Sequence, residues 1–188
     1  LVNVSSSQTD NVLTGASCKI ETYGFSNSAD WAADNYRFKN GKGYFTLSHQ
    51  GKKISDFYLP MIGRYNIENA AAVTAMCLKL GLTTQEIQKG FTTFKGIKRR
   101  QEIVGIKNEI TVIDDFAHHP TAIQLTLEAV REAYVGQRVW AIFEPRSATC
   151  KRKVFEETSL TIESLEKIVD GYELFFDKDP FNHNNGTH

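Results

Sequence analysis

The strongest constraint on the fold is an order of strand, helix and strand in the second half of the chain. Residues 110–114 (ITVID) and 138–144 (RVWAIFE) are nearly continuous apolar runs, which are typical of strands buried on both faces of a parallel sheet. Residues 121–134 carry apolar side chains at helical spacing, as a crossover helix requires. A helix over about residues 153–169 and a strand over residues 172–176 continue the alternation. We therefore predict an α/β fold with a parallel sheet.

The first half of the chain is patterned differently. Residues 1–62 contain short β-prone runs between Gly, Asn, Ser and Lys clusters, and residues 37–47 (RFKNGKGYFTL) predict a hairpin. Residues 65–82 follow helical spacing, with a glycine near their end. A second helix is predicted to follow at once, because Thr83 and Glu86 form a capping-box pattern.

The charged stretch 95–105 (KGIKRRQEIVG) separates these two halves. We place a domain boundary there, with one domain over residues 1–97 and a second over residues 98–188. The chain begins with the strand-like residues LVNV and no preceding turn. We therefore expect it to be a piece of a longer protein.

Composition argues against several classes of function. Lysine plus arginine and aspartate plus glutamate number 22 each, so no overall field attracts nucleic acid or an anionic membrane. No apolar run approaches the length of a membrane span, and the first residues lack the pattern of a signal peptide. Cys18, Cys77 and Cys150 show no C-x-x-C spacing, which argues against a disulfide framework or a zinc site. These features predict a cytoplasmic protein with no nucleic-acid or membrane partner.

Polar residues gather in the two loops that follow the predicted strands. In an open parallel sheet, ligands bind outside the carboxyl ends of the strands. We therefore expect the loops after residues 113 and 143 to share one edge of the sheet. The residues concerned are Asp114, Asp115, His118, His119, Glu144, Arg146, Ser147 and Thr149.

The stretch 113–122 (IDDFAHHPTA) allows three interpretations. A transition-metal site is disfavoured, because adjacent histidines point in divergent directions in a helix or a strand. A structural role places Pro120 in the first helical turn, with His119 or Thr121 as its cap. A nucleotide site uses a carboxylate for the ribose diol and the helix N-terminus for an anion. The residues alone leave the structural and nucleotide interpretations open.

The basic cluster Lys95, Lys98, Arg99 and Arg100 is a candidate partner for phosphate, although a charge run is more often a solvated linker. The sequence contains no P-loop spacing, and no G-x-G-x-x-G follows residue 114. If the protein uses ATP, the cradle for the triphosphate is expected outside these 188 residues.

Three segments taken together resemble the Mur ligase family. Residues 63–75 (GRYNIENAAAVTA) resemble the family's G-x-H-N-x-x-N-A-x-A-A segment, and residues 94–102 (FKGIKRRQE) resemble its inter-domain linker. Residues 113–122 resemble the start of its C-terminal domain. The resemblance implies the second half of a central ATPase domain, followed by part of a Rossmann-like C-terminal domain. It also implies ATP and Mg²⁺ as cofactors, with the magnesium ligands outside this chain, and domain closure about residues 95–105.

Mur ligases are ATP-dependent enzymes that join amino acids or peptides to UDP-muramyl precursors of the cell wall. The stretches DDFAHHP and FEPRSAT are most similar to the murein peptide ligases. These attach the tripeptide L-alanyl-γ-D-glutamyl-meso-diaminopimelate to UDP-N-acetylmuramate in peptidoglycan recycling, through an acyl phosphate that the amine attacks. Two alternatives stay open: a UDP-N-acetylmuramate–L-alanine ligase or other Mur-type ligase, and an inactive nucleotide-binding or scaffolding module. The chain alone is not expected to catalyse the reaction.

The resemblance also implies a role for individual residues. Implied to bind ATP are Asn66, Asn69, Arg100 (at a phosphate) and Asp115 (at the ribose). Implied to be catalytic are His118 and Arg146, and implied to bind the peptide substrate are Arg146, Ser147 and Thr149. No metal ligand is expected within the chain. Tyr65 departs from the family pattern, which usually has histidine there, and this puts normal turnover in question.

Overall fold

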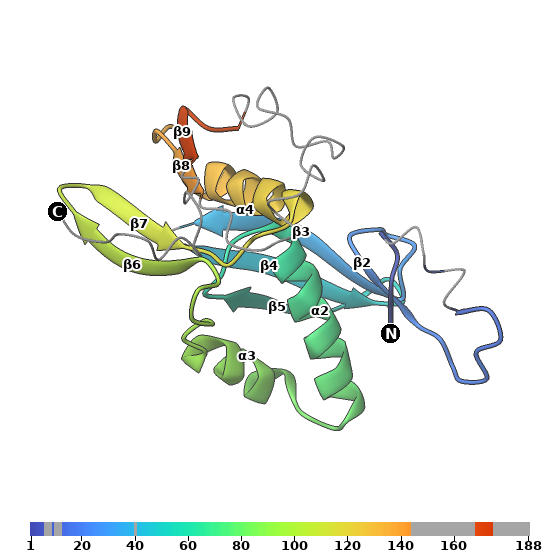
Figure 1. The fold of residues 1–188 in the computed structure, drawn as a ribbon. Helices are drawn as coiled ribbons and strands as arrows, with labels where there is room; N and C mark the ends of the chain where they lie inside the picture. The colour runs from blue at the N-terminus through green and yellow to red at the C-terminus, as the bar shows by residue number, and fades with distance from the viewer. Residues whose placement is uncertain (6–8, 10–12, 40, 144–167, 175–188) are drawn as a thin grey trace, which may run out of the picture.

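A computed structural model describes residues 1–5, 9, 13–39, 41–143 and 168–174 (Figure 1). In the first half, a five-stranded sheet carries two helices. In the second half, a β-hairpin, a helix and a two-stranded parallel sheet follow one another. The predicted α/β class is therefore confirmed.

The sheet of the first half has the strand order β1-β2-β3-β4-β5. Its strands are β1 (Val2–Asn3), β2 (Thr22–Gly24), β3 (Trp31–Lys39), β4 (Lys42–His49) and β5 (Lys52–Leu59). The pairs β1–β2 and β2–β3 are parallel, whereas β3–β4 and β4–β5 are antiparallel. The hairpin predicted over residues 37–47 is confirmed, because Lys39 lies opposite Lys42 at the end of the β3–β4 ladder.

Two helices, α2 (Arg64–Lys79) and α3 (Thr84–Thr93), pack on this sheet. Both were predicted, and the capping box at Thr83 and Glu86 is present in full. The first helix presents small and branched side chains to the strands, which lets it lie close to the sheet and bury their aromatic rings. The buried core comprises Trp31, Ala33, Phe45, Leu47, Phe57, Leu59, Ile67, Ala70, Ala71, Ala75 and Ile87.

The second half consists of β6 (Glu102–Lys107), β7 (Ile110–Asp114), α4 (Pro120–Ala133), β8 (Trp140–Phe143) and β9 (Gly171–Leu174). The hairpin β6–β7 is antiparallel, and β8–β9 is parallel. In the view of Figure 1, α4 lies above strands β3 to β5 and α3 lies below them. Contacts between α4 and β3 join the two halves.

The structure corrects the predicted pairing of the second half. Within the described residues, β7 pairs with β6 and β8 pairs with β9, and no ladder joins β7 to β8. The strands are also not buried on both faces, because Ile110, Trp140 and Ile142 are 67%, 64% and 70% exposed. The reason is local: β6 begins inside the stretch predicted as a linker. A two-residue turn at Asn108 and Glu109, both with positive φ, then folds β7 back onto it.

Candidate functional site

The N-terminus of α2 supplies the first part of the candidate site. Gly63 precedes the helix with φ 94° and ψ 138°, a conformation that is essentially restricted to glycine. Asn66 lies one turn in and is only 7% exposed. Its Nδ2 donates to the carbonyl of Ile62 at 2.7 Å and to Oε1 of Gln101 at 3.2 Å. Asn69, one turn further on, is exposed.

Asp115, directly after β7, supplies the second part. Its Oδ2 accepts from the backbone N–H of Gln101 at 2.9 Å, and its Oδ1 accepts from that of Ala117 at 2.8 Å. The hydroxyl of Thr126 on α4 lies 3.5 Å from Oδ1. The carboxylate therefore anchors both the linker and the loop that leads into α4.

Gln101 connects these two parts, and sequence reasoning did not single it out. Its Nε2 donates to the hydroxyl of Tyr65 at 2.7 Å, and its Oε1 accepts from the backbone N–H of Ile62 at 3.2 Å. Burial raises the pKa of the Tyr65 phenol, so Tyr65 is a neutral hydroxyl at neutral pH. Asn66 and Asp115 are 49 positions apart in the sequence, and each bonds to this one residue. The position of Gln101 in the KRRQE segment was the only available signal.

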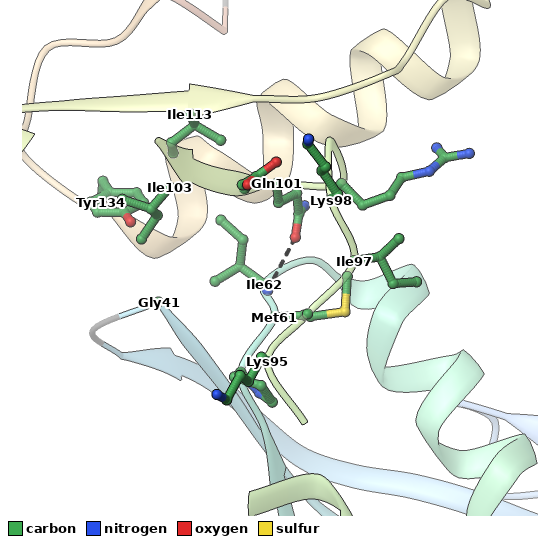
Figure 2. A pocket seen from close by; sticks show the side chains of 14 residues that line it. Gly41, Met61, Ile62, Lys95, Ile97, Lys98, Gln101, Ile103, Ile113 and Tyr134 are labelled. Atoms are coloured by element: carbon green, nitrogen blue, oxygen red, sulfur yellow. Dashed lines mark hydrogen bonds between the residues drawn. The ribbon is translucent and has the colours of Figure 1, made fainter. Parts of the chain in front are cut away.

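The basic linker borders a cavity of about 430 Å³ between the two halves (Figure 2). Its wall combines cationic linker residues with apolar side chains from both halves. The lining residues are Gly41, Pro60, Met61, Ile62, Lys95, Gly96, Ile97, Lys98, Arg100, Gln101, Glu102, Ile103, Ile113 and Tyr134. Three cations against one carboxylate favour an anion there. Arg100 borders this cavity, and its contact with a phosphate stays a prediction.

Arg99 differs from its neighbour. Its Nε lies 3.4 Å from Oδ2 of Asp114, and both side chains are partly exposed. The guanidinium carbons of Arg99 and Arg100 lie 5.3 and 5.8 Å from the ring centre of Phe116, which is within cation–π range. Asp114 therefore has a local partner and does not converge on the pair formed by Asn66 and Gln101.

The two histidines lie at the start of α4. His118 is exposed, with Nδ1 3.1 Å from the carbonyl of Phe116. His119 is the N-cap, but its side chain makes no capping hydrogen bond, and Pro120 occupies the first turn as predicted. The second loop, with Glu144, Arg146, Ser147 and Thr149, lies outside the described residues. Its convergence with the first loop therefore remains a prediction.

Within the described ranges, no group of three or more His, Cys, Asp or Glu side chains is arranged to hold a metal ion. No helix in the same part of the chain is long and apolar enough to cross a membrane.

Comparison with known proteins places the chain in a family. The Mur ligase middle domain matches residues 1–77, and the glutamate ligase domain of Mur ligases matches residues 99–170. The chain belongs to the Mur ligase family. The gap between the two matches, residues 78–98, contains Lys95 and Lys98 of the basic cluster, whereas Arg99 and Arg100 lie in the second match.

Relatives in several bacteria are named UDP-N-acetylmuramate–L-alanine ligase. The relative from Desulforapulum autotrophicum is 38% identical over 146 residues, which cover 78% of this chain and 32% of the relative. The relative from Acetivibrio thermocellus is 36% identical over 161 residues, which cover 85% of this chain and 34% of the relative. The chain thus spans about a third of the length of these Mur ligases.

Solved structures support the fold assignment. The UDP-N-acetylmuramate-alanine ligase of Thermotoga maritima superposes with a TM-score of 0.66 at 22% identity, covering 84% of this chain and 39% of that one. MurF from Acinetobacter baumannii gives a TM-score of 0.71 at 20% identity, and the match covers 94% of this chain and 42% of MurF. At these identities the match concerns the Mur ligase fold alone.

Proposed function

We propose that the chain forms the hinge region of an ATP-dependent ligase that joins an amino group to UDP-N-acetylmuramate. One observation carries this proposal: Asn66 of the first half and Asp115 of the second meet through Gln101, beside a cationic cavity. A nucleotide site formed by two domains needs such a meeting point. The relatives named above are ligases of this kind, which supports the reaction class.

The residues present fit a nucleotide. The carboxylate of Asp115 holds two backbone N–H groups, and its remaining lone pairs can accept from the hydroxyls of a ribose. Asn66 and Asn69 lie at the start of α2, where amide groups can read a base. Arg100 borders the cavity with Lys95 and Lys98, and fixed cations there stabilise phosphate charge.

ATP, when bound, supplies the phosphoryl group that activates the muramoyl carboxylate, and the magnesium ligands are expected elsewhere in the longer protein. This chain orients the nucleotide through Asn66 and Asp115 and neutralises charge through Arg100. His118 is exposed at the edge of the same region, and we propose that it faces the incoming amine. Closure about the linker would complete the site and exclude water.

The names of the relatives favour L-alanine as the amine over the tripeptide suggested by the resemblance of the two loops. The test uses the full-length protein that carries this chain, with ATP, Mg²⁺ and UDP-N-acetylmuramate. Release of ADP with L-alanine, and little with the tripeptide, supports the proposal. More ADP release with the tripeptide than with L-alanine would instead support the peptidoglycan-recycling reaction. Release with neither amine would favour the inactive nucleotide-binding module, because Tyr65 stands at the usual histidine position.

A further inference from the structure

Gln101 makes four hydrogen bonds that tie the linker to both halves of the molecule. Its backbone N–H donates to Asp115, and its side-chain Nε2 donates to Tyr65. Its Oε1 accepts from the backbone N–H of Ile62 and from Nδ2 of Asn66. Figure 2 shows the side chain of Gln101 reaching toward Ile62 at the wall of the cavity.

The backbone of Gln101 is strained. Its φ is 51°, in the left-handed region that side chains other than glycine rarely adopt, and Arg99 nearby has φ 57°. Such a conformation persists only where the surroundings hold it in place. The four hydrogen bonds provide that restraint, so a change in one of them can release the linker.

Gln101 also occupies the side-chain amide of Asn66. A side-chain amide nitrogen carries two hydrogens. At Asn66, one is directed to the carbonyl of Ile62 and the other to Oε1 of Gln101. Both donors are therefore in use. A ligand that needs an N–H of Asn66 must first displace the side chain of Gln101.

Tyr65 fixes the orientation of the Gln101 amide. The backbone N–H of Ile62 can only donate, so the atom that faces it must be the oxygen of Gln101. The nitrogen then faces the Tyr65 hydroxyl, which accepts at 2.7 Å. Tyr65 thus orients Gln101 as a positioning residue, and its side chain also interacts directly with Asn66 and Thr126.

We propose that Gln101 is a latch, held by Tyr65, that occupies the base-reading amide of Asn66 until a nucleotide displaces it. This inference rests on the proposed function, since it assumes a nucleotide at Asn66 and Asp115. When the latch is open in only a fraction of the molecules, the apparent affinity for the nucleotide is the intrinsic affinity multiplied by that fraction. Removing it therefore strengthens binding, whereas removing an ordinary structural contact does not.

The experiment measures the dissociation constant of ADP by titration calorimetry on the full-length protein. We expect Gln101→Ala to bind ADP about 3- to 10-fold more tightly than the wild type, which corresponds to a latch closed in most molecules. Tyr65→Phe should shift affinity in the same direction by about 2- to 3-fold, because it leaves the amide present but unoriented. In the double variant, the two effects should be less than additive, because Tyr65 orients Gln101 but also interacts directly with Asn66 and Thr126.

Gln88→Ala is the matched control. Gln88 also uses its amide, which donates to the hydroxyl of Ser55 and the carbonyl of Asp56 at 3.0 and 2.9 Å, but it lies in α3. Its loss should leave ADP affinity unchanged. If Gln101→Ala unfolds the protein, Tyr65→Phe still decides the matter, because unchanged or weaker ADP binding by that variant overturns the latch.

Failure of the latch can be separated from failure of the proposed function. If the wild type binds no ADP, the proposed nucleotide site is wrong, and the latch falls with it. If the wild type binds ADP and Asp115→Ala weakens that binding, the site stands. Unchanged or weaker affinity in a folded Gln101→Ala then overturns the latch alone.

Discussion

Gly63 and Ala129 are in contact where the two halves of the Mur ligase chain meet. A Cβ atom added to Gly63 would lie 2.9 Å from the Cβ of Ala129 on α4 and 2.9 Å from the ring of Tyr65. Real Cβ atoms do not approach so closely, so a side chain at position 63 would separate α4 from the start of α2. The absence of a side chain therefore sets the spacing between the two halves.

Replacing Gly63 with alanine should destabilise the protein by about 2 to 4 kcal/mol, the sum of backbone strain and overpacking. Gly81→Ala is the matched control, because its φ of 91° resembles the 94° of Gly63 but nothing lies within 4 Å of the added Cβ. Gly81→Ala should lower the free energy of unfolding by only about 1 kcal/mol. Urea unfolding curves measure both changes. Equal losses in the two variants would contradict the role of the contact with Ala129.

Glu21 provides a pH-dependent contribution to stability. Hydrogen bonds from Lys79, Trp31 and Lys19 lower the pKa of this buried carboxyl to about 2, from an ordinary value of 4.5. Because the folded pKa lies below the unfolded one, the contribution is complete above pH 4.5 and is lost as the pH falls toward 2. The urea midpoint, followed by tryptophan fluorescence, should therefore fall between pH 5 and about pH 2.5.

The variant Glu21→Gln is the control for this prediction. It keeps an acceptor for the indole of Trp31, which donates to Oε2 at 2.7 Å, but removes the charge that pairs with Lys79 at 2.8 Å. The fall of the midpoint with pH should become shallower, and the remaining slope should come from other carboxyls with lowered pKa, such as Asp30. A slope as steep as that of the wild type would exclude Glu21 as its source.

The sequence predicted the elements whose signals are local. The capping box at Thr83 and the hairpin that ends at Lys39 and Lys42 depend on residues within a few positions of one another. The apolar run at 110–114 was misassigned to the interior of a parallel sheet, because its partner β6 lies in a charged segment that reads as a linker. The charges before β6 obscure its β-prone residues Ile103 and Ile106, which lie opposite Ile113 and Thr111 of β7.

The candidate site likewise contains residues that the sequence could identify and one that it could not. Asn66 and Asp115 follow from the resemblance of their segments, and the structure brings both to Gln101. Gln101 itself could not be identified from the sequence, because its importance comes from a positive φ and from partners 35 to 39 positions away. Neither property has a local signature.

Thr83→Ala should destabilise α3 by about 1 kcal/mol, because the helix loses its N-cap acceptor. In the structure, Oγ1 of Thr83 accepts from the backbone N–H of Glu86 at 3.3 Å and donates to the Glu86 carboxylate at 2.7 Å. The neighbouring Thr84→Ala is the control, and it should change the free energy of unfolding by less than about 0.5 kcal/mol. Denaturant unfolding compares the two variants. A loss at Thr84 as large as that at Thr83 would contradict the capping argument.

Asp115→Ala in the full-length protein should raise the apparent KM for ATP about 10-fold or more, because a ribose loses its acceptor and the linker loses its anchor at the N–H of Gln101. The KM for the UDP-linked substrate should stay nearly unchanged, since the hydrogen bonds of Asp115 run to the linker, to the loop before α4 and to α4. Asp114→Asn is the matched control, because it disrupts only a partly exposed pair with Arg99 and should leave both constants near wild type. Steady-state kinetics with each substrate varied in turn make the comparison. An equal rise in both KM values for Asp115→Ala would assign the carboxylate to general stability and remove it from the nucleotide site.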